Sequence, residues 1–282
     1  MAFLLLQDVH AQNDQNKIRD TTKTTIDLNE VIISVNKWEQ KLNEVPNKIV
    51  KIGKYDILRN NPQTAADLLG QSGMVFIQKS QLGGGSPMIR GFATNRVLLV
   101  VDGVRMNNAI YRSGNLQNII SIDALSTEAA EVIFGPGSLI YGSDAIGGVM
   151  DFHTLEARFS KDSTMLVKGN VLGRYSSANK EKTGHTDINL GWKKWSLLSS
   201  FTYSSFDDLK MGKNGGQEIY GRPEYVERIN NIDSIVKNND PRIQRFSGYD
   251  QVNFLQKIRF KPNQHWDFQY SFNYAKTGDA PR

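Results

Sequence analysis

Hydrophobic and polar positions follow one pattern in the middle of the chain and another in its last third. From residue 48 to residue 154, short apolar runs are separated by glycine-rich turns. Val97–Val101 and Glu131–Phe134 are such runs, and each ends at turn residues. Apolar, β-prone runs bounded by turn residues are typical of strands, so we predict that both lie in a central sheet.

A short helix is predicted between these strands and the N-terminal part of the chain. Thr64 stands three residues before Asp67 and is followed by Leu68-Leu69, which is the pattern of a capped helix start. Gly70–Gly73 ends this helix, and the apolar run Met74–Ile77 is predicted to be a strand. Short strands mixed with short helices and glycine turns indicate a compact α+β domain.

After about residue 160, aromatic and polar residues alternate strictly along segments of about ten residues. The alternation predicts strands near 164–175, 188–192, 195–203, 252–260 and 266–274. In the last of these, one face carries Trp266, Phe268, Tyr270, Phe272 and Tyr274, and the other carries Asp267, Gln269, Ser271 and Asn273. A soluble sandwich also alternates. The aromatic face, and the short connections at 193–194 and 261–264 beside the long one at 206–248, favour a transmembrane β-barrel.

Composition removes several classes of protein. No apolar run approaches the ~18 residues that indicate a membrane-spanning helix. The net charge of +5 is mild and spread along the chain, which argues against a nucleic-acid-binding protein. There is no cysteine, and the four histidines are scattered, so we predict no metal site and no catalytic set. The glycines at 83–85 and 135–137 lack the spacing of a nucleotide-binding loop. The acidic and amide residues near 207 and 240 lack the ordered pattern of a calcium site.

The stretch from Gly83 to Thr154 contains several motifs in a characteristic order: PMIRG at 87–91, VLLVVDG at 97–103 and GPGSLIYGSDAIGG at 135–148. This stretch resembles the plug domain of TonB-dependent outer-membrane receptors. The resemblance implies an α+β plug domain followed by antiparallel transmembrane β-strands, the N-terminal part of a barrel of about 22 strands. We expect a remnant signal peptide at 1–12, a periplasmic tail at 13–45, the plug at 46–158 and the first five barrel strands at 159–282.

The resemblance also implies a function. The protein is expected to be a receptor rather than an enzyme, with no intrinsic cofactor, in the outer membrane of a Gram-negative bacterium. Its ligand is expected to be iron-containing or similarly large, haem in the first place, with a siderophore or cobalamin as alternatives and a haem-carrying protein as a further partner. A β-prone run beside a polar tail suits strand pairing with a TonB-type periplasmic protein. The residues of this TonB-box-like segment are Leu28, Asn29, Glu30, Val31, Ile32, Ile33 and Ser34.

Candidate ligand contacts lie in the amide-rich segment that follows the Asp102-Gly103 turn. They are Asn108, Tyr111, Arg112 and Asn115. A tyrosine offers an aromatic ring and an oxygen that can ligate ferric iron. Arg112 offers a two-pronged donor for a carboxylate.

Two arginines are candidates for ion pairs between plug and barrel, as in related receptors. Arg90, held between Ile89 and Gly91, is expected to be buried and to need a carboxylate partner, and Arg105 is the second candidate. Phe134 stands where the commoner family pattern has an arginine, which removes one expected pair.

Two other functions remain open from the sequence. One is a plug-like module that binds or senses a ligand without transporting it. The other is an unrelated soluble α+β protein.

Overall fold

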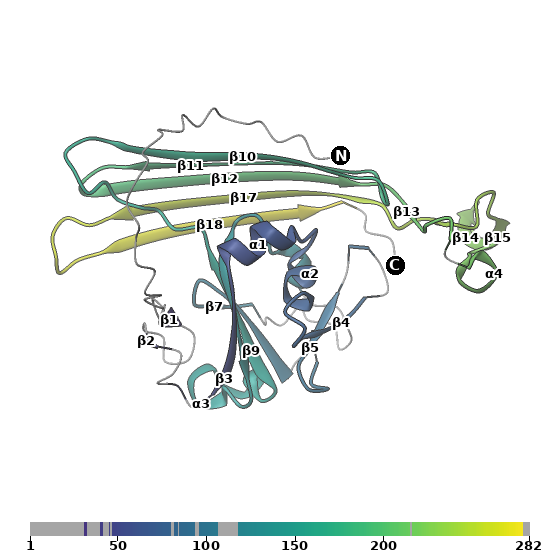
Figure 1. Cartoon of the computed structure of the whole chain (residues 1–282), viewed down its shortest axis with the longest axis horizontal. Coiled ribbons are helices and arrows are strands. Elements are labelled where there is room, and N and C mark those ends of the chain that lie inside the picture. The colour runs from purple at the N-terminus through teal and green to yellow at the C-terminus, as the bar shows by residue number, and fades with distance from the viewer. Residues whose placement is uncertain are drawn as a thin grey trace, which may run out of the picture.

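The computed structural model describes residues 31–32, 40–41, 45, 47–79, 82–83, 85–93, 96–106, 118–214 and 216–278. Two five-stranded sheets dominate the molecule. We call them the plug sheet and the wall sheet. In Figure 1 the long strands of the wall sheet run across the top, and the plug sheet stands beneath them with its helices. Within the described residues, no helix is long and apolar enough to cross a membrane.

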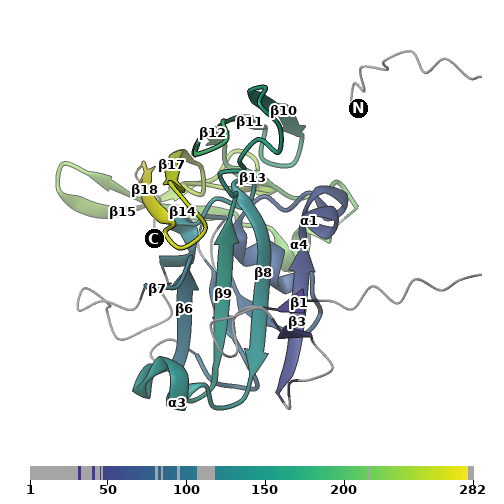
Figure 2. The ribbon, with the colours of Figure 1, turned by 90° about the vertical axis from the view of Figure 1, so that its left-hand side faces the viewer.

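The plug sheet has the strand order β3-β8-β9-β6-β7, which Figure 2 shows side by side. Its strands are β3 (Lys48–Gly53), β6 (Val97–Val101), β7 (Val104–Arg105), β8 (Thr127–Phe134) and β9 (Gly148–Thr154). β6 and β9 are parallel, and the other neighbours are antiparallel. The predicted strand Val97–Val101 is confirmed, and Glu131–Phe134 is the second half of β8.

Two short helices, α1 (Lys54–Asn60) and α2 (Ala65–Gly70), follow the first strand of the plug sheet. The hydroxyl of Thr64 accepts a hydrogen bond from the backbone N–H of Asp67, which confirms the predicted helix cap. The strand predicted at Met74–Ile77 begins two residues later. It is β4 (Phe76–Gln78) and pairs with β5 (Ser86–Met88). Near the N-terminus, β1 (Val31–Ile32) pairs with β2 (Gln40–Lys41).

The plug sheet is buried on both faces. On one face, Phe134, Met150 and Phe152 pack with side chains of α2 and of the short helix η3 (Asn118–Ser121). On the other face, Leu98, Ile133 and Val149 pack against Tyr141 of α3 (Ser138–Tyr141) and against Ala145 of η4 (Ser143–Ala145). Strands buried on both faces read as continuous apolar runs, which is why β6 is Val-Leu-Leu-Val-Val.

The wall sheet is antiparallel throughout, in the order β10-β11-β12-β17-β18. Its strands are β10 (Leu166–Ser176), β11 (Glu181–Gly191), β12 (Trp195–Phe206), β17 (Tyr249–Phe260) and β18 (Phe268–Thr277). All five predicted strands are present, although β11 begins at Glu181 rather than near Ile188. The long connection between β12 and β17 carries β13 (Leu209–Lys210), α4 (Gln217–Tyr220), β14 (Glu224–Ile229), β15 (Ile232–Lys237) and β16 (Ile243–Gln244). In Figure 1 this connection projects beyond one end of the wall sheet.

The two faces of the wall sheet differ in chemistry, as the alternation predicts. Aromatic rings gather on the face turned away from the plug. Trp195 stacks on Phe260 with ring centroids 4.1 Å apart, and Phe260 and Trp266 each stack on Phe268. The face turned toward the plug is mainly polar and includes the buried residues Ser196, Ser200, Thr202, Asn253 and Lys257.

Candidate functional site

The contact between the plug and the wall sheet is where residues from distant parts of the chain meet. One charged point of this contact is Asp102, in the turn between β6 and β7. Asp102 has a φ of 48°, a left-handed conformation that aspartate tolerates better than most residues. Its carboxylate accepts hydrogen bonds from the backbone N–H and the hydroxyl of Thr154, at 2.9 and 2.6 Å. The Nζ of Lys257, on β17, lies 3.0 Å from the same carboxylate.

A second contact joins the segment before β8 to the strand β12. Asp123 accepts hydrogen bonds from the hydroxyls of Ser126 and Thr202, at 2.5 and 2.6 Å. The hydroxyls of Ser126 and Ser200 lie 2.9 Å apart and form a further hydrogen bond. Three hydroxyls and one carboxylate therefore connect the plug to the wall at this contact.

A third contact holds the loop between α1 and α2. Arg174 on β10 and Glu181 on β11 form a buried ion pair, with Nε 2.6 Å from Oε1. Arg174 also donates to the Asn61 side chain and to the Pro62 carbonyl, both at 2.9 Å. Glu181 accepts from the Gln63 amide at 2.6 Å. Both charges of this contact belong to the wall, and the plug supplies only neutral groups.

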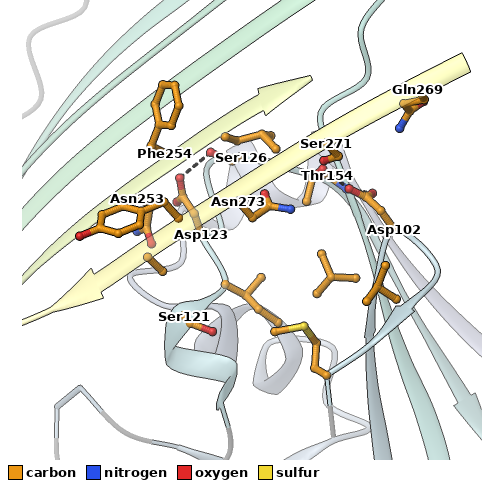
Figure 3. A pocket seen from close by; sticks show the side chains of 17 residues that line it. Asp102, Ser121, Asp123, Ser126, Thr154, Asn253, Phe254, Gln269, Ser271 and Asn273 are labelled. Atoms are coloured by element: carbon orange, nitrogen blue, oxygen red, sulfur yellow. Dashed lines mark hydrogen bonds between the residues drawn. The ribbon is translucent and has the colours of Figure 1, made fainter. Parts of the chain in front are cut away.

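Between the first two contacts lies a cavity of about 600 Å³. Figure 3 shows Asp102 and Thr154 on one side of it, Asp123 and Ser126 on the other, and β18 passing across. Most of its polar lining is neutral and consists of hydroxyl and amide groups of Ser121, Ser126, Thr154, Asn253, Gln269, Ser271 and Asn273. This lining suits a ligand or solvent that exchanges neutral hydrogen bonds.

Buried ionisable groups also lie within the plug. Glu131 and Asp151 are cross-strand partners on β8 and β9, and both are almost completely buried. Burial, reinforced by the charge of Glu131, raises the pKa of Asp151 to about 6, although His153 opposes the shift. Burial lowers the pKa of His153, but the Glu131 and Asp151 carboxylates raise it by more. Burial and the nearby Asp151 also raise the pKa of Tyr141. Within the described residues, no such group is arranged to hold a metal ion.

The candidate ligand contacts Asn108, Tyr111, Arg112 and Asn115 lie outside the described residues, so their roles remain predictions. The two ends of their segment are described, however. Met106, before the segment, and Ser121, after it, both line the cavity. Of the predicted TonB-box-like segment, only Val31 and Ile32 are described, and they form β1.

The two arginines expected at the plug–barrel contact are placed differently. Arg90 is exposed rather than buried, with a φ of 48°. Its guanidinium lies 5.8 Å from the centroid of the Phe134 ring, so the phenylalanine that replaces the usual arginine instead receives a cation on its face. Among the described residues, Arg105 pairs with Asp144 of the plug, at 2.8 Å. A wall carboxylate for Arg90 remains a prediction.

Sequence reasoning missed the residues that do connect plug and wall. Lys257 was not singled out, and Asp102 was identified only as a turn residue. A lysine in the middle of a strand, on the face that also carries Asn253 and Leu255, is a signal for a buried partner because an unpaired buried cation is costly. The sequence does not identify that partner, since strand order brings the two together.

Comparison with known proteins gives the context of this site. Residues 41–149 match the family model of the TonB-dependent Receptor Plug Domain. The chain is 38% identical over 261 residues to the vitamin B12 transporter BtuB of Vibrio vulnificus strain CMCP6, covering 89% of this chain and 39% of that protein. It is 33% identical over 180 residues to the BtuB of strain YJ016, covering 62% of this chain and 26% of that protein. The chain thus spans about two fifths of the length of the first of these relatives and about a quarter of the second.

Solved structures share the fold at low identity. The pyoverdine outer membrane receptor FpvA from Pseudomonas aeruginosa PAO1 superposes with a TM-score of 0.62 at 13% identity, covering 88% of this chain and 30% of that one. The copper transporter OprC gives a TM-score of 0.62 at 15% identity, covering 81% and 31%. The names are those of receptors and transporters, in agreement with the prediction that the chain is not an enzyme. Residues 41–149 are therefore a TonB-dependent receptor plug domain, and the antiparallel strands that follow it resemble the barrel of these receptors.

Proposed function

We propose that this chain forms the plug and adjoining barrel strands of an outer-membrane receptor that takes up a corrinoid. The observation that carries the proposal is its 38% identity, over 89% of the chain, to a vitamin B12 transporter. The fold supports the transport class, because a plug packed against one polar barrel face is what an energy-driven receptor requires.

The charges at the plug–wall contact favour a neutral ligand group over an anionic one. Three cations on the plug-facing side of the wall, Arg174, Lys257 and Arg259, each hold a carboxylate: Glu181, Asp102 and Asp267. An anionic ferric chelate or haem would have to compete with these carboxylates. The amide side chains around a corrinoid ring can exchange hydrogen bonds with the amides and hydroxyls that line the cavity.

Ligand binding to the receptor that carries this chain tests the proposal directly. Cyanocobalamin, haem and a ferric catecholate are titrated separately against the purified receptor. We expect cyanocobalamin to bind at least a hundredfold more tightly than the other two. Haem is the ligand expected first from the sequence motifs. Tighter binding of haem than of cyanocobalamin would reject the proposal of a corrinoid ligand.

The segment 107–117 is the proposed ligand contact, through Tyr111 and Arg112. A corrinoid presents a broad face for the tyrosine ring and a phosphodiester for the guanidinium. Losing a charge-assisted contact costs about 1.5–3 kcal/mol, or about ten- to a hundredfold in affinity. We therefore expect Arg112→Ala to weaken cyanocobalamin binding about tenfold or more, and Asn118→Ala, just beyond the segment, to serve as the control. If neither Tyr111→Ala nor Arg112→Ala changes the dissociation constant by threefold, the contact lies elsewhere.

Transport is proposed to depend on a TonB-type periplasmic protein that pairs with the segment Leu28–Ser34. Deleting this segment is expected to abolish corrinoid uptake by cells and to leave cyanocobalamin binding to the purified receptor unchanged. Retained uptake would show that transport does not depend on this segment, whereas binding without any uptake by the unchanged receptor would favour a ligand-sensing module. Loss of binding as well would show that the segment belongs to the ligand site.

A further inference from the structure

The ion pair between Asp102 and Lys257 differs from the other contacts of the plug in the way its charges are divided. Asp102 belongs to the plug and Lys257 to the wall, and among the described residues theirs is the ion pair that joins the plug sheet to the wall sheet. Arg174 and Glu181 also hold the plug, but both lie on the wall. Displacing the plug therefore leaves Arg174 and Glu181 paired, whereas it separates Asp102 from Lys257.

Burial makes this separation costly. The Lys257 side chain is 3% exposed and that of Asp102 is 18% exposed. Lys257 also donates to the backbone carbonyl of Thr154 at 3.4 Å, so one ammonium group holds both the β6–β7 turn and the end of β9. A buried cation that loses its partner must be solvated again or remain unpaired.

The cavity lies beside this contact, because Asp102 and Thr154 are part of its lining (Figure 3). Once Asp102 moves, the cavity and the space that held the turn become continuous along the wall. The position of the ion pair thus couples two events, the release of the turn and the widening of a polar passage.

We propose that Asp102 and Lys257 form a latch that keeps the β6–β7 turn and the end of β9 against the wall, and that breaking it opens the passage between plug and barrel. The polarity of this latch, with the acid on the plug and the base on the wall, is opposite to that expected for Arg90 and Arg105. The inference rests on the proposed receptor function in one respect, that the plug must be displaced for a ligand to pass.

Leakage through the receptor tests the latch without any corrinoid, so a wrong ligand assignment does not affect the result. Lys257→Gln, Asp102→Asn and the double variant are expressed in cells, and entry of a bulky hydrophilic antibiotic is measured per receptor in the outer membrane. We expect each single change to raise entry at least fivefold and the double variant to leak about as much as the single ones. Lys257→Arg keeps the charge and is expected to stay within twofold of the unchanged receptor.

The matched control is Arg105→Gln, which breaks the ion pair between Arg105 and Asp144 inside the plug. It is expected to leave antibiotic entry within twofold. Equal leakage in Arg105→Gln and Lys257→Gln would overturn the latch, as would entry within twofold for both Lys257→Gln and Asp102→Asn.

A labelling experiment gives a second readout that needs only a small amount of folded receptor. This chain has no cysteine, so Ser121→Cys places its single thiol in the cavity lining, and any cysteine elsewhere in the receptor is first replaced by serine. We expect a membrane-impermeant maleimide to label it at least fivefold faster when Lys257→Gln is also present. An unchanged labelling rate would show that the cavity does not open when the ion pair is lost.

Discussion

The plug sheet and the wall sheet are both five-stranded, yet the plug sheet buries apolar side chains and the wall sheet buries mainly polar ones. Every strand position of β6 from Val97 to Val100 is buried, and apolar side chains cover both faces of the plug sheet. In the wall sheet, the face that meets the plug is mostly hydroxyl, amide and charged, while the aromatic face is turned outward. The plug is thus built like a water-soluble domain, with apolar side chains inside. The wall sheet has the reverse arrangement, with polar side chains inside and aromatic side chains outside.

This difference explains why plug and wall meet largely through polar contacts. Only two small apolar clusters lie between them among the described residues, Leu155 and Ala157 with Leu198 and Leu255, and Leu82 with Phe206 and Tyr249. An apolar interface would fuse the two sheets into one core, because burial of apolar area is favourable at about 25 cal/mol per Å². Hydrogen bonds contribute only about 0.5–1.5 kcal/mol each, since water replaces them when they break. A plug held by Asp123, Gln63 and Asp102 can therefore be displaced as a folded unit more easily than one held by an apolar core.

The largest expected effect is in the core of the plug. Phe152 on β9 is completely buried, so Phe152→Ala leaves a cavity that the close-packed plug cannot fill. We expect a loss of about 3–5 kcal/mol in the free energy of unfolding, measured by denaturant titration of the detergent-solubilised receptor. Phe254→Ala, on the outward face of β17, is the control and should cost clearly less. An equal loss at the two positions would mean that the two sheets do not differ as described.

The second prediction concerns the outward face of β18. Tyr270 is 59% exposed among other aromatic side chains. If this face meets lipid, Tyr270→Lys near mid-membrane should cost about 2–4 kcal/mol in folding into bilayers. Ser271→Lys, one residue along and facing the cavity, is the control and should cost less than about 1 kcal/mol, because the lysine remains in a wet lumen. Equal costs on the two faces would indicate a soluble sheet.

Sequence reasoning identified the two sheets well because each has a local signal. Val97–Val101 was predicted with its observed bounds, since a strand buried on both faces appears as an unbroken apolar run. The start of β11 was missed by seven residues because its first half lacks any apolar pattern. Glu181, Thr183 and His185 face the plug, and their outward neighbours are Lys182, Gly184 and Thr186, so no apolar alternation exists there.

The candidate site was predicted less well because its contacts are non-local. Arg105 was expected to reach the wall, but β7 is a two-residue edge strand and its arginine lies beside Asp144 of the same domain. Arg174 and Glu181 were not singled out, although their strands are consecutive, because their function depends on the Asn61–Gln63 loop being docked against them. Charges whose partners depend on docking cannot be assigned from periodicity.

The third prediction concerns the carboxyl group of Asp151, which is buried in the closely packed plug. It tests whether the plug, unlike the polar face of the wall, excludes water from an acidic group. The pKa of Asp151 is about 6 in the folded plug, against an ordinary value of 3.8 for aspartate, so the folded state binds the proton more tightly. The stabilisation is complete below about pH 4 and is lost as the pH rises to about 6. We expect the free energy of unfolding to fall by up to about 3 kcal/mol over this range.

Asp151→Asn should remove most of this pH dependence and make the receptor more stable than the unchanged protein at pH 7. Titration of His153, whose pKa is also raised, adds a loss of stability above its ordinary range, and this loss should shrink in the variant because the Asp151 carboxylate is one of the groups that raise the pKa. Denaturant titrations at pH 4, 5, 6 and 7 measure both effects. An unchanged pH dependence in Asp151→Asn would place the responsible group elsewhere.

The smallest expected effect lies where plug and wall meet, at the hydrogen bond between Ser126 and Ser200. Ser200→Ala leaves the Ser126 hydroxyl its bond to Asp123, so this change should cost about 1 kcal/mol. Ser126→Ala removes a donor from Asp123 as well and should cost more. Replacing both hydroxyls should cost less than the sum of the single changes, because neither is then left without its partner. A double-mutant cycle on the unfolding free energy measures the coupling, expected at about 0.5–1.5 kcal/mol. Strict additivity would mean that the plug and β12 are independent here, and that the plug is held mainly by its charged contacts.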